Sequence, residues 1–395
     1  MSLTFLLPAS LLALSLAPDV QPPQPVSIPV VQTREGLAHV FTKLKARKPV
    51  TVAWFGGSIT EGAGASNGDE TSYRGLVGHW FTTTFPQSHV TNVNAAIGGT
   101  GSDLGAFRLG RDVLAHRPDL VFVEFAVNDG GAPEAMIDRA MEGIVRQIRR
   151  ADPDTDICFV YTFVVGWLPE FQAGRLVHSV QRDEIVAAHY GLPSVNMAVP
   201  AARKLIDGAM TAAEFSKDGV HPTDAGYRIY ADALIAFLTQ QRDDRARPHK
   251  RRLPPALRPD SLEHARMIGA DTITPAPGWA VTDRDSTGRF PHLLASDTPG
   301  ATQTVGFSGP ILAMFYVLGP DTGAFDYKID DGPWQTLDPF DVFAKGYARA
   351  HYRLLADGLP DTPHTLTLKI RADHNPDSKG TYTRIGYLLT SPGHG

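Results

Sequence analysis

Three side chains of this sequence combine the hydroxyl, imidazole and carboxylate that nucleophilic catalysis needs. Ser58 lies in the segment FGGSIT, and Asp218 and His221 share the segment DGVHP. A serine hydroxyl is a weak nucleophile at its ordinary pKa, so it requires a base within hydrogen-bond reach. His221 can accept the serine proton and return it to a leaving alcohol, while Asp218 can hold the imidazole tautomer and stabilise the imidazolium. These residue types predict acyl-transfer chemistry at Ser58.

The spacing of the acid and the base predicts that both come from one loop. Asp218 and His221 are three positions apart, and Gly219 between them allows a tight turn. In α/β-hydrolases the acid and the base come from separate loops, and a Gly-x-Ser-x-Gly turn carries the nucleophile. Ser58 has no such pattern around it. The sequence therefore argues against the α/β-hydrolase fold.

Two further segments complete an ordered set of motifs within residues 50–228. NAAIGGT occupies residues 94–100 and FAVND occupies residues 125–129, between the serine and histidine segments. The set resembles the SGNH (GDSL-type) hydrolase family, whose members cleave esters with a serine nucleophile. One departure is Gly57, because the family usually has an aspartate directly before the serine. The nucleophile itself is in place, so we expect catalysis to survive this change.

The resemblance implies three hydrogen-bond donors for the oxyanion of the tetrahedral intermediate. They are the backbone N–H of Ser58, the backbone N–H of Gly99 and the side-chain amide of Asn128. Such preorganised donors stabilise the charge that develops as the ester carbonyl is attacked. A glycine suits position 99, because a residue without a Cβ lets the backbone approach the reacting carbon closely. Gly98 is the neighbouring alternative.

Hydrophobic patterns place these motifs on alternating strands and helices. A continuous apolar run predicts a buried strand at 50–55, and further strands are predicted at 90–97, 120–127, 157–165 and 193–197. Helices are predicted at 73–85, 133–150, 172–190 and 224–239. Such alternation indicates a parallel sheet covered by helices on both faces. The predicted fold class is therefore α/β, with an SGNH-type three-layer α/β/α domain built on a five-stranded parallel sheet.

The motif residues fall at one edge of this predicted sheet. Ser58, Gly99 and Asn128 follow the first, second and third strands, and His221 lies in the loop after the fifth. Open α/β sheets bind their ligands beyond the carboxyl ends of the strands. This placement follows from hydrophobic periodicity alone, and it agrees with the motifs.

The pattern changes beyond residue 240. Residues 241–252 read QRDDRARPHKRR and prolines follow, so we interpret residues 241–262 as a basic, proline-rich, solvated linker. Attachment of this basic run to an anionic surface is the alternative. We expect the hydrolase domain, residues 31–240, to stay folded and active without the rest of the chain.

Residues 263–395 have the pattern of an all-β sandwich. TLTLKI at 365–370 alternates apolar and polar residues, and IDDGPW at 329–334 predicts a hairpin turn. The stretch from 355 to 366 resembles the jelly-roll modules attached to some carbohydrate esterases. Further strand candidates are 311–318 and 385–389.

The N-terminus predicts export. Residues 1–17 form a short apolar stretch compatible with signal cleavage after Ala17, although the usual basic start is missing. A packed strand or helix is the alternative, and the stretch is too short and too interrupted by Pro8 for a membrane span. Residues 18–30 are proline-rich and expected to be extended. Export without disulfides favours a secreted or periplasmic bacterial protein.

The composition argues against several function classes. The net charge of −5 is unlike the positive field that broad, salt-dependent nucleic-acid binding needs. Cys158 is the one cysteine, so no intramolecular disulfide is available, and we interpret it as a buried apolar side chain. Neither metal-ligand spacing nor a phosphate-binding glycine loop is recognisable, so no cofactor or metal is expected. The oligomeric state is left open.

Other polar and aromatic residues are weaker candidates for the cleft. Four of them could line it but are more easily explained as structural: Arg74, Asp103, Glu124 and Asp129. Trp167 follows the fourth strand and could form a wall for a sugar or an acyl group, or simply pack. Three aromatic residues of the second domain could stack on sugar rings, although a place in the sandwich core is the preferred interpretation: Tyr316, Trp334 and Tyr352.

Together these features predict a serine esterase that removes O-acyl groups, chiefly O-acetyl groups, from carbohydrates through an acyl-enzyme. The ester chemistry rests on the five motif residues, and the carbohydrate rests on the β-module resemblance and the expected export. A lipase, an arylesterase or a thioesterase would use the same residues with an apolar acyl channel. A non-catalytic sugar-binding protein is the alternative outside the enzymes. The expected partner is the acylated carbohydrate, with neither nucleic acid nor stable membrane insertion.

Overall fold

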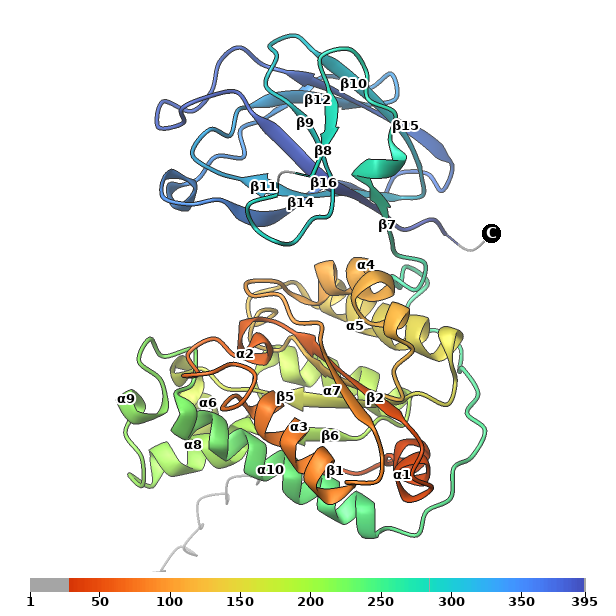
Figure 1. The fold of residues 1–395 in the computed structure, drawn as a ribbon, viewed down its shortest axis with the longest axis vertical. Helices are drawn as coiled ribbons and strands as arrows, with labels where there is room; N and C mark the ends of the chain where they lie inside the picture. Colours follow the sequence, from red (N-terminus) through yellow and green to blue (C-terminus); the bar gives the residue numbers. More distant parts are fainter. Residues whose placement is uncertain (1–27, 284, 394–395) are drawn as a thin grey trace, which may run out of the picture.

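The computed structural model describes residues 28–283 and 285–393. Figure 1 shows two stacked domains, an α/β domain made of the elements β1 to α10 and a β domain made of the elements β7 to β16. The expected signal peptide and most of the proline-rich segment lie outside the described residues. Within the described part, no helix has both the length and the apolar character to cross a membrane.

The α/β domain is built on a six-stranded sheet with the order β1-β6-β5-β4-β2-β3. Its strands are β1 (Val31–Gln32), β2 (Val50–Gly56), β3 (Val90–Asn94), β4 (Leu120–Glu124), β5 (Asp156–Tyr161) and β6 (Ser194–Asn196). Strands β2 to β6 are parallel, which confirms the five-stranded parallel sheet. The two-residue β1 adds an antiparallel edge beside β6.

Helices cover both faces of this sheet. They are α1 (Ala38–Lys45), α2 (Ser58–Glu61), α3 (Tyr73–Thr84), α4 (Ser102–Asp112), α5 (Glu134–Ala151), α6 (Leu168–Gln172), α7 (His178–His189), α8 (Ala198–Ile206), α9 (Ala212–Phe215) and α10 (Asp224–Asp243). Successive strand residues point to opposite faces. Ala53 and Phe55 of β2 therefore pack with α4, α5 and α7, while Val52 and Trp54 pack with α1, α3, α8 and α10. Cys158 of β5 is fully buried, as predicted.

The predicted helix at 172–190 corresponds to α7, which begins later than predicted, and only the first predicted residue belongs to α6. α6 ends at Gln172 and α7 begins at His178. Gly174 between them has φ of +67°, a left-handed conformation that favours glycine and ends helices. The hydrophobic patterns also did not predict α1, α4 or α8.

The β domain is a sandwich of two antiparallel sheets, as predicted. One sheet contains β10 (Thr302–Ser308), β15 (Pro363–Ile370), β12 (Phe325–Ile329) and β13 (Gln335–Leu337). The other contains β14 (Arg349–Asp357), β11 (Ile311–Leu318), β16 (Thr383–Thr390), β9 (Leu293–Ser296) and β8 (Ala280–Thr282), with β7 (Arg266–Gly269) beside β16. The predicted hairpin turn joins β12 to β13.

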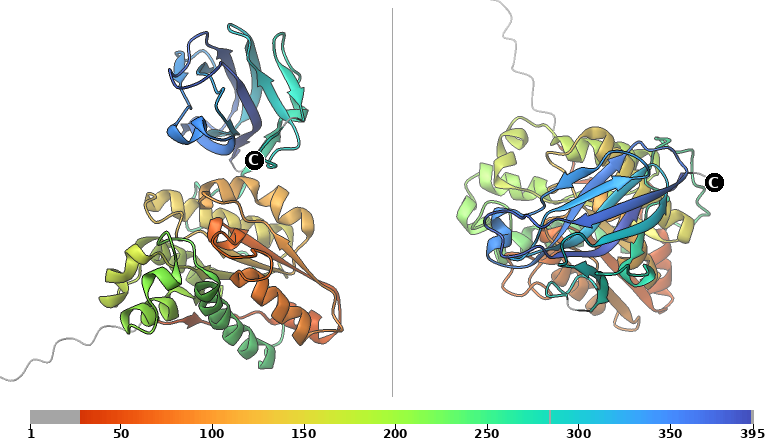
Figure 2. Two further views of the ribbon diagram at one scale, coloured as in Figure 1. Left: turned by 60° about the vertical axis from the view of Figure 1, so that its left-hand side comes forward. Right: turned by 90° about the horizontal axis from the view of Figure 1, so that it is seen from above.

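Strand β11 joins the cores of the two domains, because all eight of its residues are buried. Leu312 and Met314 point into the sandwich, whereas Ala313 and Phe315 belong to the apolar core that also contains residues of α4 and α5. Figure 2 shows the β domain lying directly over these two helices. The shared core argues against the expectation that the hydrolase domain is independent of the rest of the chain.

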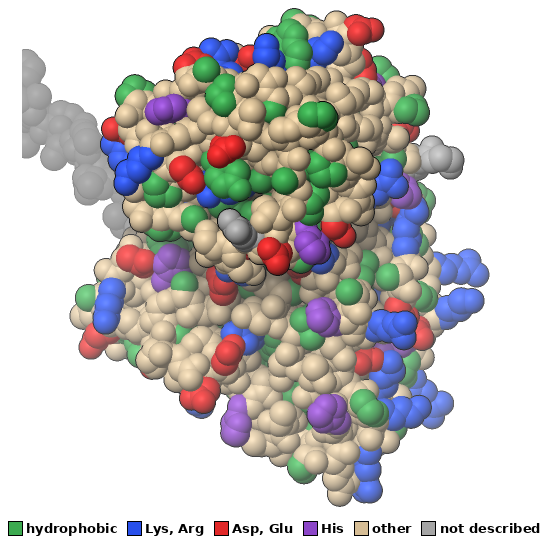
Figure 3. Space-filling model, turned by 45° about the horizontal axis from the view of Figure 1, so that its top comes forward, with side chains coloured by type: hydrophobic (Ala, Val, Ile, Leu, Met, Phe, Trp, Pro, Cys, Tyr) green, Lys and Arg blue, Asp and Glu red, His purple; other side chains and the backbone are tan. Residues whose placement is uncertain are grey.

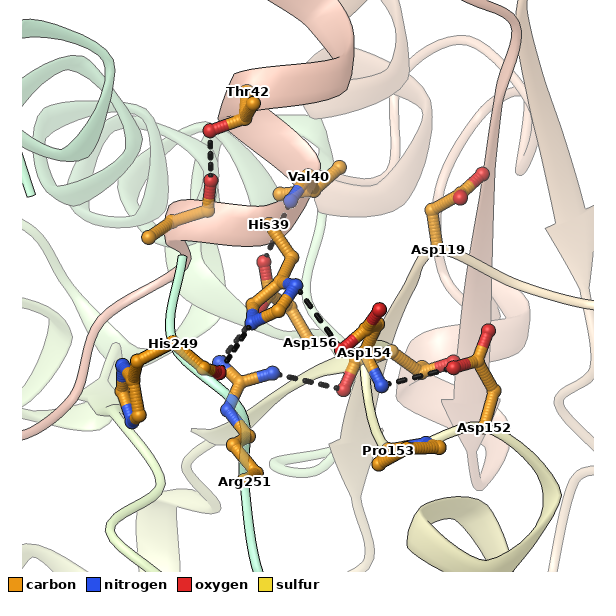
Figure 4. Close-up of polar contacts among 12 residues, drawn as sticks. His39, Val40, Thr42, Asp119, Asp152, Pro153, Asp154, Asp156, His249 and Arg251 are labelled. Carbon is orange, nitrogen blue, oxygen red and sulfur yellow. Dashed lines mark hydrogen bonds and ion pairs between the residues drawn. The ribbon is translucent and has the colours of Figure 1, made fainter. Parts of the chain in front are cut away.

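The basic segment after α10 is a solvated linker only at its start. Residues 243–250 are exposed, and Figure 3 shows lysine and arginine side chains gathered along one flank of the molecule. Arg251 is buried, and its Nη2 lies 2.5 Å from Oδ1 of Asp156. Figure 4 shows this ion pair beside His39, whose Nε2 lies 3.1 Å from the backbone oxygen of His249.

The remainder of this segment packs on α5. The buried Glu142 carboxylate accepts the backbone N–H groups of Leu257 and Arg258 at 2.6 and 2.9 Å. Leu262 is buried against Gly143, where an added Cβ would lie 2.6 Å from the backbone carbon of Leu262. The interpretation as a solvated linker is therefore wrong for Arg251, Ser261 and Leu262, which are buried, although other residues between them are exposed.

Candidate active site

Ser58 is the first residue of the short helix α2, which follows β2 directly. A Cβ on Gly56 would lie 2.5 Å from the backbone oxygen of Glu124, so a glycine is needed where the end of β2 approaches β4. Ser58 Oγ lies 2.8 Å from His221 Nε2, which is hydrogen-bond distance. The predicted nucleophile and base lie near the two ends of the domain in the sequence, and the fold brings them into contact.

Asp218 and His221 come from one loop between α9 and α10. His221 Nδ1 lies 2.7 Å from Asp218 Oδ2, so the imidazole bridges the carboxylate and the serine hydroxyl. Asp218 Oδ1 accepts the backbone N–H groups of Val220 and His221 at 2.9 and 2.8 Å. Hydrogen bonds from the His221 ring and backbone lower the pKa of Asp218, which keeps the carboxylate ionised. Gly219, with φ of +80°, makes the tight turn that this geometry requires.

The two neighbouring glycines after β3 have different environments. The N–H of Gly98 donates to Oε2 of Glu61 at 2.9 Å. Gly99 has φ of +72°, and a Cβ added to it would meet nothing within 4 Å. Among the described residues, neither the N–H of Gly99 nor that of Ser58 has a hydrogen-bond acceptor. Of the two glycines, Gly99 therefore has the free donor.

Asn128 lies in the turn after β4, and its side-chain amide contacts Gly57. A Cβ on Gly57 would lie 2.0 Å from Oδ1 of Asn128, far inside van der Waals contact. The glycine that departs from the family motif therefore makes room for the amide of Asn128. That this amide joins the N–H groups of Ser58 and Gly99 as a donor to a developing oxyanion stays a prediction from the sequence.

A cavity of about 580 Å³ lies between the two domains, beside these donors. Gly99 and Asn128 line its wall on the α/β domain. The opposite wall comes from the β domain and includes Thr287, Arg289, Arg349, His351 and Tyr352. The sequence patterns singled out only Tyr352 among these five. No local pattern relates the others to Ser58, because they lie far along the chain from it.

The four polar residues considered for the cleft fall into two pairs. Asp103 and Asp129 line the cavity, and burial raises the pKa of both, that of Asp129 to about 7. Arg74 is buried and donates to three backbone oxygens in and after α2. Glu124 accepts two threonine hydroxyls inside the domain. The structural interpretation is therefore correct for Arg74 and Glu124.

The aromatic candidates also differ from one another. Trp167 is half-buried against Gly130, where an added Cβ would lie 3.0 Å from its ring, so it packs. Tyr316 is buried in the sandwich core, as preferred. Trp334 has an exposed fraction of 48%, so the core interpretation is wrong for it. Tyr352 packs against the core shared by the domains and also lines the cavity.

Known structures share the whole two-domain fold. A crystal structure of a two-domain esterase (CEX) active on acetylated mannans, co-crystallized with mannopentaose, is 23% identical, covers 90% of this chain and 94% of that chain, and superposes with a TM-score of 0.77. A second crystal structure of a two-domain esterase (CEX) active on acetylated mannans is 22% identical, covers 91% and 96%, and has a TM-score of 0.76. No curated protein sequence matches the chain.

The family match covers the whole candidate site. Residues 54–229 match the GDSL-like lipase/acylhydrolase family, and this range includes Ser58, Gly99, Asn128, Asp218 and His221. The β domain lies outside this match. The similar two-domain structure described above covers 90% of this chain and therefore includes the β domain. Over residues 54–229 the chain is therefore similar to the GDSL-like lipase/acylhydrolase family, and this similarity includes every residue of the candidate site.

Proposed function

We propose that the protein is a serine esterase that removes O-acetyl groups from carbohydrates through an acyl-enzyme. The observation that carries this proposal is the pair of hydrogen bonds from Asp218 through His221 to Ser58, at 2.7 and 2.8 Å. An imidazole held between a carboxylate and a hydroxyl is arranged to take up and return a proton. The unpaired donors beside it support attack on a bound carbonyl.

The reaction proceeds in two halves on this geometry. Ser58 Oγ attacks the ester carbonyl carbon while His221 Nε2 takes the hydroxyl proton, and the N–H of Gly99 and the amide of Asn128 help to hold the oxyanion. The intermediate then collapses, the bond to the sugar oxygen breaks, and that oxygen takes the proton from His221. Water attacks the acylated Ser58 by the same route, which releases acetate and restores the serine.

The lining of the cavity supports a carbohydrate substrate. Polar and charged side chains outnumber the large apolar ones in its wall, and Tyr352 adds an aromatic ring. Sugar hydroxyls need hydrogen-bond partners, whereas a long acyl chain needs an apolar channel. The similar two-domain esterases are described as active on acetylated mannans, so acetylated mannan is the first substrate to test.

The test measures acetate released from acetylated mannan and xylan oligosaccharides, together with kcat/KM for acetate, butyrate and octanoate esters. We expect acetate release from at least one glycan and a preference for acetate esters. A preference for octanoate with no acetate released from any glycan would favour a lipase or thioesterase. Glycan binding without any ester hydrolysis would favour a non-catalytic sugar-binding protein.

We also propose that the protein is exported, as residues 1–17 predict. N-terminal sequencing of the protein from the periplasm or medium of a bacterial host should find a start after Ala17. A cytosolic protein that retains the apolar segment would contradict this proposal.

A further inference from the structure

The last residue of α2, Glu61, connects the nucleophile helix to both domains. Its Oε2 accepts the N–H of Gly98 at 2.9 Å. Its Oε1 lies 2.5 Å from Nη2 of Arg289, which belongs to the β domain. One oxygen of this carboxylate therefore binds the glycine loop, residues 98–99, and the other oxygen pairs with an arginine of the β domain.

Arg289 comes from a loop that is fixed on both sides of this residue. The carboxylate of Asp285 accepts the backbone N–H groups of Thr287, Arg289 and Phe290 at 2.8, 2.6 and 2.9 Å. Phe290 is buried, and its ring centroid lies 4.6 Å from that of Phe315 on β11. The backbone of Arg289 is thereby anchored to the core that the two domains share, and its guanidinium reaches Glu61 from this anchored position.

The position of Gly98 bears directly on the oxyanion donors. A Cβ added to Gly98 would lie 2.9 Å from Oε2 of Glu61 and 3.4 Å from Cβ of Ser58, so this glycine is wedged between the two side chains. The peptide that follows it carries the free N–H of Gly99. Only the two backbone torsions of Gly98 separate its own N–H from that of Gly99, so holding the N–H of Gly98 restrains the N–H of Gly99.

We propose that Arg289 is a positioning residue that completes the oxyanion hole from the β domain. It holds the Glu61 carboxylate against the N–H of Gly98, and this contact fixes the N–H of Gly99 relative to Ser58. Glu61 and Arg289 are each about one-third exposed, so without the arginine the carboxylate is free to turn toward water. The inference rests on the proposed function, because it assigns Arg289 a part in the same reaction.

The test uses 4-nitrophenyl acetate, a small ester that reaches Ser58 without filling the cavity. Arg289→Met should lower kcat on the order of tenfold, less than the 10²–10³-fold loss expected when an oxyanion donor is deleted. KM should stay within about twofold, because the donor acts mainly once charge develops. Arg289→Lys, which keeps the charge, should recover most of the lost kcat.

Glu61→Gln supplies a second variant that does not depend on the folding of the Arg289 loop. It should lower kcat by a similar factor. The double variant Glu61→Gln with Arg289→Met should be no slower than the slower single variant, because both changes remove the same contact between Glu61 and Arg289. Additive losses would overturn the proposal.

Arg139→Met is the matched control. Arg139 Nη2 lies 2.7 Å from Oδ2 of Asp357, so this pair also joins α5 to the β domain, but it does not touch the glycine loop. The control should keep the kcat of the unchanged protein. An equal loss in Arg139→Met would mean that domain docking alone matters, and unchanged kcat in Arg289→Met would exclude the positioning role. If the unchanged protein hydrolyses no ester, the proposed function fails instead.

Discussion

The amide oxygen of Asn128 occupies the space in which a side chain of residue 57 would begin. A Cβ on Gly57 would lie 2.0 Å from this oxygen, and no rotation about a side-chain bond moves a Cβ away. Any residue other than glycine at position 57 must therefore displace Asn128. In this chain the glycine at position 57 therefore leaves the amide of Asn128 where it is.

Gly57→Ala should impair the oxyanion hole and leave the side chains of Ser58, His221 and Asp218 in place. We expect kcat to fall by about 10²-fold, because a shift of about 1 Å in a positioned group has that order of effect. Asn128→Ala should lower kcat by about 10²–10³-fold with little change in KM. Steady-state kinetics on an acetate ester measures both.

The double variant Gly57→Ala with Asn128→Ala separates the two explanations. It should be no slower than Asn128→Ala alone, since the alanine at 57 acts by displacing an amide that is then absent. A further large loss, or a loss expressed mainly in KM, would show that Gly57 acts through something other than Asn128.

Ser58→Ala should reduce kcat by roughly 10³-fold or more, because only binding and oxyanion effects remain once the nucleophile is removed. A fluorophosphonate probe should label Ser58 in the unchanged protein, and mass spectrometry of the digested protein locates the label. Labelling at another serine, or full activity in Ser58→Ala, would assign the chemistry to a different residue.

Glu124 should make the stability of the fold depend on pH. Burial raises the pKa of its carboxyl from 4.5 to about 7, so between these values the folded protein holds a proton that the unfolded chain releases. Within this range each rise of one pH unit lowers the free energy of unfolding by about 1.4 kcal/mol through this one group. Above pH 7 the protonated Glu124 no longer contributes to the free energy of unfolding.

Glu124→Gln removes this titration and leaves the other carboxyls in place. Thermal unfolding at pH 5 and pH 8 should show that the unchanged protein loses more stability than the variant over this interval. Equal losses in the two proteins would mean that Glu124 is already ionised in the fold at pH 5.

A chain that ends at Gln240 should be less stable than the whole protein. It lacks Arg251, which pairs with the buried Asp156, and Leu262, which covers Gly143 on α5. It also exposes the apolar face that β11 covers. Thermal unfolding and gel filtration measure the loss.

A chain that ends at Ala265, just before β7, is the informative comparison. It keeps the packed part of the segment and loses only the β domain, so it should be intermediate in stability. If both truncated chains unfold at the temperature of the whole protein, the shared core contributes nothing to the α/β domain.

The sequence alone determined the strands of the parallel sheet and the order of the site residues along them. Strands buried on both faces must be apolar throughout, so the runs at 50–55 and 120–127 stand out from their surroundings. Ser58 and Asn128 directly follow these runs, which places them at one sheet edge before any contact is known. β11 was predicted with its full bounds, Ile311–Leu318, for the same reason.

Only the tertiary structure decided which residues of the β domain face the site. The apolar run of β11 shows that both its faces are buried, but periodicity does not say that one of them covers α4 and α5. Arg289 and Tyr352 reach the cavity because that packing fixes how the two domains lie together. Secondary structure is encoded by neighbours along the chain, whereas a contact between distant segments depends on the fit of two complete surfaces, which no local pattern contains.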